Sequence, residues 1–119
     1  NLPSRRPWLR LEDILENSEA ILEYTKGMTE NEYHADRKTK DACERCLSRI
    51  SEAAVKLKLF AEQKLPQHNW EGIRNLGNVL RHEYDQLENP SIWDVISLHL
   101  PTLAHDVKQL LTIERPEDD

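Results

Sequence analysis

The feature that most constrains the fold is the spacing of the apolar residues, which recur every three or four positions in four long stretches of the chain. These stretches cover about 8–25, 36–59, 70–84 and 92–111, and each places its apolar residues along one face of a helix. The chain has only 3 Gly and few clusters of β-branched residues, so strands and tight hairpins are disfavoured. The pattern predicts an all-α protein whose amphipathic helices bury their apolar faces against one another.

Residues that cap or stop helices separate the four stretches: Gly27, the pair Thr29 and Glu32, Leu65-Pro66, Asn69 and Asn89-Pro90-Ser91. Because short links force neighbouring helices to run antiparallel, we expect an up-and-down four-helix bundle. Pro101 lacks a backbone donor and predicts a kink in the last helix, or two abutting helices. Trp70 and Trp93 are expected to act as large packing anchors. Four apolar stripes in a small bundle leave surface for a second copy, which predicts a symmetric dimer.

The 119 residues suffice for one core of ordinary size, so we expect a single domain over 8–113. Residues 1–7 are predicted to form an extended lead-in, and 114–119 a disordered acidic tail. No run of about 18 apolar residues occurs, and the first residues do not resemble a secretory signal. We therefore expect no membrane segment and a cytoplasmic location.

Cys43 and Cys46 form a CxxC pair, a spacing that suits a redox site or half of a zinc site. No second CxxC or HxxxH completes a metal site, and no βαβ pattern surrounds the pair. On a helix the two thiols share the apolar stripe with Ile50, where free cysteine behaves as a small hydrophobe. We predict that both are buried packing residues and that the protein holds no metal or cofactor.

The third stretch carries an apolar stripe formed by Ile73, Leu76, Leu80 and Leu87. The opposite face is polar and is formed by Arg74, Asn78, Arg81, His82 and Asp85. An imidazole, two guanidinium groups and an amide can transfer a proton and stabilise a developing anion, which points to a phosphate ester as substrate. The simpler interpretation is a solvated histidine paired with an aspartate on a charged helix surface. The net charge of -6 predicts that any RNA contact is local and only weakly dependent on salt.

Three segments carry a resemblance to a known family: Ser51-Glu52-Ala53-Ala54, the run from Trp70 to Tyr84, and Ile92-Trp93 with Leu100-Pro101. They resemble the second helix, the central helix and the final helix of the HEPN superfamily. Within it, the chain is most similar to the toxins of toxin–antitoxin pairs whose partner is a minimal nucleotidyltransferase. The resemblance covers most of the chain, from Leu9 to Leu111.

The resemblance implies a helical dimer that cleaves RNA without a metal, by attack of the ribose 2'-hydroxyl on the adjacent phosphate. His82 matches the catalytic histidine of the family's Arg-x4-6-His motif, and Asn78 matches the asparagine after the motif arginine. Tyr84 matches the tyrosine that the nucleotidyltransferase antitoxin modifies with AMP to silence the toxin. Packing against the apolar stripe is the alternative role for Tyr84.

One position departs from the family motif, because Gly77 stands where the motif arginine is expected. Arg81 lies one helical turn later, and helical side chains lean toward the N-terminus. We hypothesise that Arg81, with or without Arg74, replaces the missing guanidinium.

Two further interpretations stay open at this point. The bundle could have lost catalysis and serve as an RNA-binding or oligomerisation module, with Gly77 as the sign of that loss. Nucleotide binding is a weaker alternative, since no Gly-rich phosphate loop is present. Glu52 is either a surface carboxylate or a buried contact to the central helix.

Overall fold

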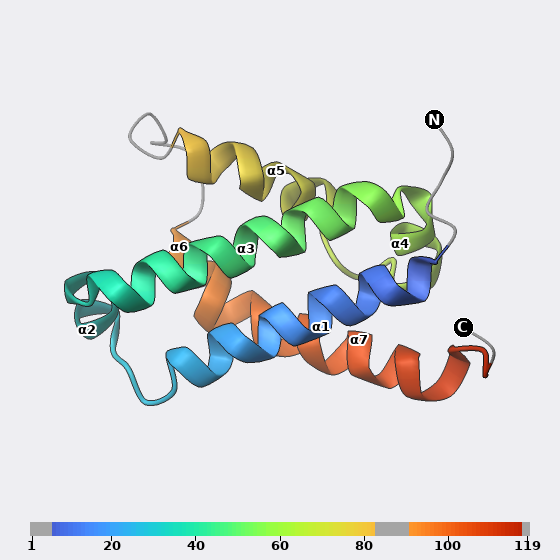
Figure 1. Cartoon of the computed structure of the whole chain (residues 1–119), viewed down its shortest axis with the longest axis horizontal. Coiled ribbons are helices and arrows are strands. Elements are labelled where there is room, and N and C mark those ends of the chain that lie inside the picture. The colour runs from blue at the N-terminus through green and yellow to red at the C-terminus, as the bar shows by residue number, and fades with distance from the viewer. Residues whose placement is uncertain (1–5, 83–90, 118–119) are drawn as a thin grey trace.

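The computed structural model describes residues 6–82 and 91–117 of the chain. Seven α-helices and one π-helical segment make up this part. Their bounds are α1 Pro7–Tyr24, α2 Glu30–Ala35, α3 Arg37–Leu57, α4 Leu59–Lys64, α5 Trp70–Arg81, α6 Ile92–Asp94, η2 Val95–His99 and α7 Leu100–Glu114. Figure 1 shows α1, α3, α5 and the final helix as four long rods that alternate in direction. The predicted all-α, up-and-down bundle is confirmed.

The rods form an open array in which α3 and α1 are central, α5 packs on α3, and α7 packs on α1 (Figure 1). Apolar residues from α1, α3 and α7 fill the core and are almost completely excluded from solvent: Leu11, Ile14, Ile21, Leu47, Ile50 and Val107. Cys43 and Cys46 lie in the same core as free, buried thiols, as predicted. Burial raises the pKa of the Cys43 thiol to about 11, which makes it a poor nucleophile at neutral pH.

The local capping signals act as the sequence predicts. Thr29 and Glu32 form a reciprocal capping box at the start of α2, Asn69 accepts a hydrogen bond from Gly72 N at 3.1 Å, and Ser91 accepts one from Asp94 N at 3.0 Å. Gly27 adopts the left-handed conformation, with φ of 77°, in the turn after α1. Each cap depends only on residues within one turn of it, which explains why sequence alone finds them.

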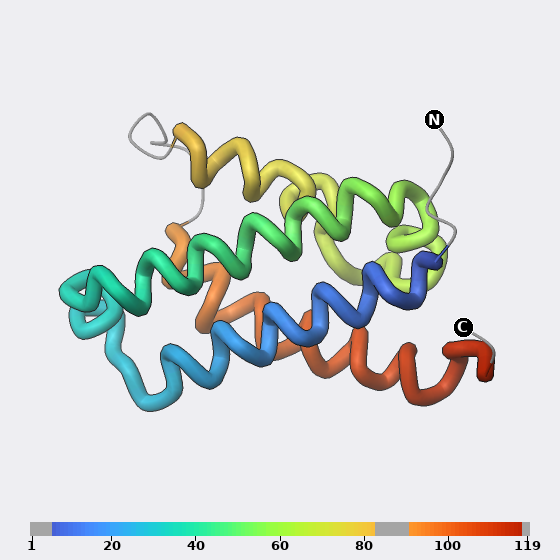
Figure 2. The backbone as a smooth tube through the Cα atoms, in the orientation of Figure 1, coloured from blue at the N-terminus to red at the C-terminus, as the bar shows by residue number. Residues whose placement is uncertain are grey.

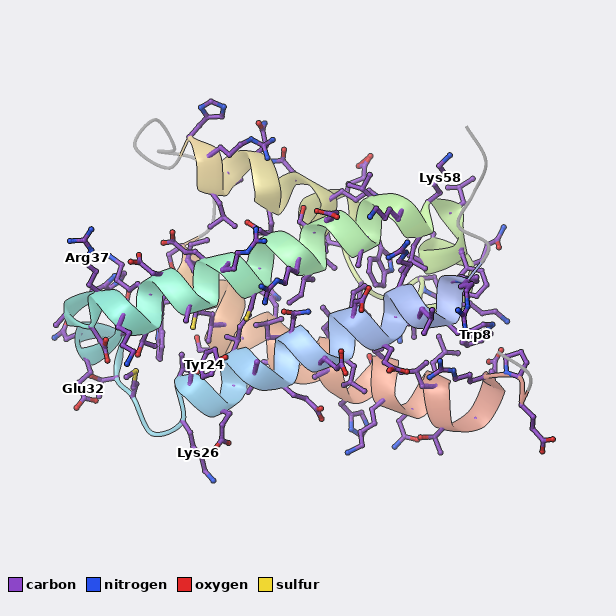
Figure 3. The ribbon with its side chains drawn as sticks, viewed as in Figure 1. Trp8, Tyr24, Lys26, Glu32, Arg37 and Lys58 are labelled. Carbon is purple, nitrogen blue, oxygen red and sulfur yellow. The ribbon has the colours of Figure 1, made fainter. Side chains whose placement is uncertain are left out.

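The second stretch differs from the expected single helix over 36–59, because it breaks at Lys58 and continues as α4. Lys58 adopts φ of 52° and ψ of -138°, a region that is costly for a residue with a side chain. Figure 3 shows Lys58 at this corner, where the chain turns from α3 into α4. The predicted stop at Leu65-Pro66 is correct, and it ends α4 instead of α3.

The last helix is irregular next to Pro101, as predicted. Residues 95–99 form a π-helical segment, in which Leu100 N bonds to Val95 O five residues back. The wider turn accommodates a proline ring that would clash with the carbonyl group four residues earlier in a regular α-helix. The tube in Figure 2 changes direction here, between α6 and α7.

The two tryptophan anchors differ in their burial. Trp70 is 1% exposed and donates Nε1 to Leu65 O at 2.7 Å, while Trp93 is half-buried with its ring 5.3 Å from that of Tyr33. Tyr33 of α2 is also buried. Its burial depends on Trp93, which is 60 residues away and gives no local signal.

The C-terminal residues are attached to the bundle as far as the structure describes them. Glu114 belongs to α7 and accepts a hydrogen bond from Lys64 at 2.7 Å, and Arg115 pairs with Glu12 of α1. The disordered tail expected over 114–119 is therefore wrong for Glu114 and Arg115, and 118–119 lie outside the described residues. No helix within 6–82 or 91–117 is long and apolar enough to cross a membrane.

Candidate functional site

The predicted site lies on α5, whose orientation depends on its contacts with α3. Leu76 and Val79 are the buried residues in the middle of α5, and Ile73 and Leu80 are half-buried at the edges of the interface. The stripe predicted from sequence included Leu80 and omitted Val79, so α5 is rotated slightly from that prediction. Leu87, also assigned to the stripe, lies outside the described residues.

Ser51 of α3 joins directly to the backbone of α5. Its hydroxyl donates to Arg74 O at 2.8 Å and accepts from Gly77 N at 3.1 Å. A Cβ at position 77 would stand 3.3 Å from Ser51 Oγ, which is a tight contact. Glycine at this position therefore allows the close approach of the two helices.

Arg81 reaches back over the same glycine. Its Nη1 lies 3.5 Å from the position that a Cβ of residue 77 would occupy. Helical side chains lean toward the N-terminus, so a guanidinium one turn later covers the vacant position. The side chain of Arg81 is exposed as a whole, and its charged end lies beside Ser51 and Gly77.

Arg74 was expected on the exposed face and instead points into the corner between α3 and α4. It binds Glu62 through two hydrogen bonds of 2.6 and 2.8 Å, and donates to Ala54 O at 3.3 Å and Lys58 O at 2.7 Å. Through the hydrogen bond, the carboxylate raises the pKa of Arg74 and the guanidinium lowers the pKa of Glu62. Arg74 thus caps the strained end of α3 and is separated from the other candidate residues.

His82 ends α5 and is exposed beside Arg81 and Asn78. Its backbone N–H is shared between Asn78 O and Val79 O, both at 3.2 Å. The structure therefore brings together Asn78, Arg81 and His82 at the C-terminal end of one helix. Tyr84 and Asp85, the other two candidates of this segment, lie outside the described residues.

Glu52 makes no contact with α5 of the kind expected for a supporting residue. Its side chain is 68% exposed and binds Lys56 on its own helix at 3.1 Å. The hydrogen bond from Lys56 lowers the pKa of Glu52. Of the two interpretations left open, the surface carboxylate is correct.

The family described as ribonuclease HepT-like matches residues 14–110, which include α3, the α5 segment and most of α7. The chain belongs to the HepT-like ribonuclease family. The predicted membership in the HEPN superfamily is thereby confirmed.

Similar proteins from archaea and bacteria support the assignment. A protein of Methanocaldococcus jannaschii with the provisional name of an RNase is 33% identical over 109 residues, covering 92% of this chain and 90% of the relative. A protein of Caldanaerobacter subterraneus with the same kind of name is 31% identical, with 92% and 96% covered. A protein of Thermococcus cleftensis, provisionally named ribonuclease HepT, is 27% identical, with 84% and 91% covered. No solved structure matches the chain significantly.

A polar contact that the sequence did not reveal fixes the N-terminal end of α5 in this HepT-like chain. His68 Nε2 lies 2.8 Å from Asp106 Oδ2 of α7, and Gln67 donates to the same oxygen at 3.2 Å. The hydrogen bond to His68 lowers the pKa of Asp106. The partners are 38 residues apart, so no local pattern could have identified them.

Beside this contact, α5, η2 and α7 enclose a pocket of about 160 Å³ with mainly apolar walls. Its lining includes His68 and His99 together with Ile50, Leu76 and Leu103. Within the described residues no group of three His, Cys, Asp or Glu side chains is placed to hold a metal ion.

Proposed function

We propose that this HepT-like protein is the toxin of a toxin–antitoxin pair and cleaves cytoplasmic RNA without a metal ion. The ribose 2'-hydroxyl attacks the adjacent phosphate and displaces the 5'-oxygen, leaving a cyclic phosphate end and a 5'-hydroxyl end. His82 acts as general acid or base in this transfer, Arg81 stabilises the charge that develops on the phosphate oxygens, and Asn78 orients the phosphate.

The observation that carries the proposal is the position of Arg81 Nη1, 3.5 Å from the vacant Cβ site of Gly77. In the family motif an arginine occupies this position. Here the guanidinium beside this position belongs to Arg81, in the next turn of α5. The same turn ends at His82, so a cation and an imidazole lie at one exposed helix end. Arg74 is excluded from the proposed catalytic group because Glu62 and two carbonyl groups occupy its guanidinium.

Regulation follows from the family resemblance. We propose that a minimal nucleotidyltransferase antitoxin silences the toxin by adding AMP to Tyr84, two residues after His82. We further propose that the active form is a homodimer, or a higher oligomer, in which two such helix ends face a common cleft. Asp85 would pair with the imidazole in its charged form.

The alternative function is a catalytically impaired bundle that binds RNA or a protein partner. The observation that favours it is the 3.3 Å approach of Ser51 to the Cβ position of residue 77, because helix packing already occupies the place of the motif arginine.

The deciding experiment is cleavage of mixed tRNA and mRNA by the purified protein in EDTA, with analysis of the product ends. We expect cyclic phosphate ends from the parent and from His105→Ala, a control at an exposed histidine on α7. Activity should vanish in His82→Ala and fall about 100-fold in Arg81→Ala, as when one charge-stabilising donor is removed. Lys108→Ala is the control for the lost charge.

Full activity in Arg81→Ala would exclude the substitute guanidinium. No cleavage by a folded sample that carries no modification at Tyr84, combined with retained RNA binding, would favour the binding module.

A further inference from the structure

The positive charge of this chain is concentrated on one helix. Residues 37–58, which include α3, contain seven Lys and Arg against three Asp and Glu, whereas the rest of the chain has nine against nineteen. An acidic protein of net charge -6 thus carries a segment with a net charge of +4. This uneven distribution of charge produces an electrostatic field that attracts a polyanion to one side of the molecule only.

Four exposed cations of α3 fall on one straight line, which we call the basic row: Lys38, Arg45, Arg49 and Lys56. They are spaced by seven, four and seven residues. At 100° per residue they lie within about 40° of one another around the helix, and they span about 27 Å along it. Figure 3 marks the two ends of this helix with Arg37 and Lys58.

Two of the three carboxylates of α3 form ion pairs on the same helix, one of them with Lys56 of the row itself. Arg37 pairs with Asp41 at 3.8 Å and Lys56 with Glu52 at 3.1 Å. Among the residues that the structure describes, no carboxylate forms a salt bridge with Arg45 or Arg49. The centre of the row therefore presents two guanidinium groups to solvent.

The charges at the start of α3 do not stabilise the helix. Arg37, Lys38 and Lys40 lie in or next to its first turn, which contains no acidic residue. Cations at a helix N-terminus oppose the macrodipole, by about 0.3–1 kcal/mol each at an exposed position. A role in binding accounts for a charge pattern that helix stability disfavours.

The row is bordered on one side by a hollow between α1 and α3. Arg10 of α1 lines this hollow of about 200 Å³ together with Arg49, Lys56 and the carboxylates Asp13 and Glu52. On the other side, Ser51, which contacts α5, lies about 140° around α3 from the row. The helix α5 runs antiparallel to α3, from the Ser51–Gly77 contact toward the half of α3 that carries Arg45 (Figure 1). The row is therefore a surface separate from the candidate site on α5.

We propose that the basic row of α3 is a track for the phosphodiester backbone of single-stranded RNA. This inference rests on the proposed ribonuclease function and adds the surface that holds the substrate. Arg45 and Arg49 bind successive phosphates and read no base, so the track contributes affinity without sequence preference.

The test is binding of a fluorescent oligouridylate by full-length protein carrying His82→Ala, measured between about 50 and 200 mM salt. The double variant Arg45→Ala/Arg49→Ala removes two phosphate contacts. Each contact to a single strand contributes about 0.7 to the slope of log K against log salt, so the slope should fall by about 1.4. At about 0.1 M salt the Kd should rise about 25-fold.

Two controls separate the track from general charge. Lys26→Ala/Lys108→Ala removes the same charge from exposed positions outside the row and should leave slope and Kd within twofold of the parent. Arg45→Lys/Arg49→Lys keeps the charges and should retain the slope. Thermal unfolding should be the same for all three variants, because the substituted side chains are exposed.

An unchanged slope in the Arg45→Ala/Arg49→Ala variant would overturn the track while leaving the proposed function intact, provided that the protein with His82 cleaves RNA. Equal losses of RNA affinity in both alanine double variants would also overturn it. The same holds if the Arg45→Ala/Arg49→Ala variant keeps RNA binding and loses binding to an acidic protein partner. Failure of the parent to bind or cleave RNA would instead remove the proposed function itself.

Discussion

The two faces of α3 are joined to their neighbours in different ways. On the α1 side the contact is apolar, and Leu11, Ile14 and Ile21 of α1 are all 0% exposed. On the α5 side only Trp70, Leu76 and Val79 of the twelve helical residues are buried, and directed polar contacts supplement the apolar ones. The helix α5 thus adds Trp70 and Leu76 to the common core, and hydrogen bonds of Ser51 and Arg74 attach it to α3.

The apolar contacts and the polar contacts of α3 have different effects: the first stabilise the fold, and the second fix the position of α5. Apolar burial is non-directional and tolerates small rotations of a helix, whereas a hydrogen bond fixes the distance and angle between named atoms. The Ser51 hydroxyl and the Arg74 guanidinium therefore set how α5 is rotated and how far it slides along α3. We expect substitutions in the core to change the free energy of unfolding, and substitutions of the polar contacts to change the position of His82.

The largest effect is expected from Leu47→Ala, which empties a fully buried position of α3. Loss of transfer free energy plus the cavity should lower the free energy of unfolding by about 3 kcal/mol. Urea denaturation followed by circular dichroism would measure it. The matched control is Ile73→Ala at a half-buried position of α5, with a smaller loss; an equal loss for both would mean that the α5 contact stabilises the protein as much as the centre of the core does.

The next effect concerns Arg74→Ala, which removes hydrogen bonds to Ala54 O and Lys58 O together with the Glu62 pair. Hydrogen bonds from a charged donor to the part-buried Ala54 carbonyl group and the exposed Lys58 carbonyl group, together with the Glu62 pair, support a loss of about 2 kcal/mol. Hydrogen exchange should accelerate in α4 and α5 and remain unchanged in α1. Arg74→Lys should not restore protection, because an ammonium group cannot bind Glu62 through two nitrogen atoms; uniform acceleration along the chain would contradict a local attachment.

A smaller effect is expected from Ser51→Ala, which leaves Gly77 N without its side-chain acceptor. The cost should be about 1 kcal/mol in thermal or urea unfolding. If Ser51 also positions the site, RNA cleavage should fall by more than this loss of stability explains. Ser48→Ala, at a half-buried serine of the same helix, is the control. Identical behaviour of the two variants would show that the Ser51 contact does not orient α5.

The smallest effect is a pH dependence at the Asp106–His68 contact. The pKa of Asp106 is lowered in the folded protein, so this contact stabilises the fold above the unfolded pKa of about 3.9 and is lost as pH falls through the lower folded value. In urea titrations the stability difference between the parent and Asp106→Asn should shrink below about pH 4. A difference that stays constant down to low pH would mean that the carboxylate charge has no part in the contact.

Sequence reasoning succeeded wherever the cause of a feature lies within one helical turn. The capping pairs at Thr29 and Ser91, the end at Leu65 and the irregular helix near Pro101 all follow from neighbouring residues. The joint placement of Asn78, Arg81 and His82 also follows from helical spacing. The break at Lys58 was missed because its cap comes from Arg74, sixteen residues further along the chain.

The sequence by itself determined the four amphipathic rods, their order and the family. Helical periodicity and capping residues are local features, and motif residues can be matched by their order and spacing along the chain. Only the tertiary structure decided what each polar side chain of α5 does. The guanidinium of Arg74, which was expected at the site, is bound to Glu62, and the side chain of Glu52 on α3 faces solvent. Arg81 covers Gly77, although the sequence could only suggest it. The physical reason is that a helix places every side chain at a known angle around its axis. Only the packing partner of the helix determines which side chains are buried, paired or exposed.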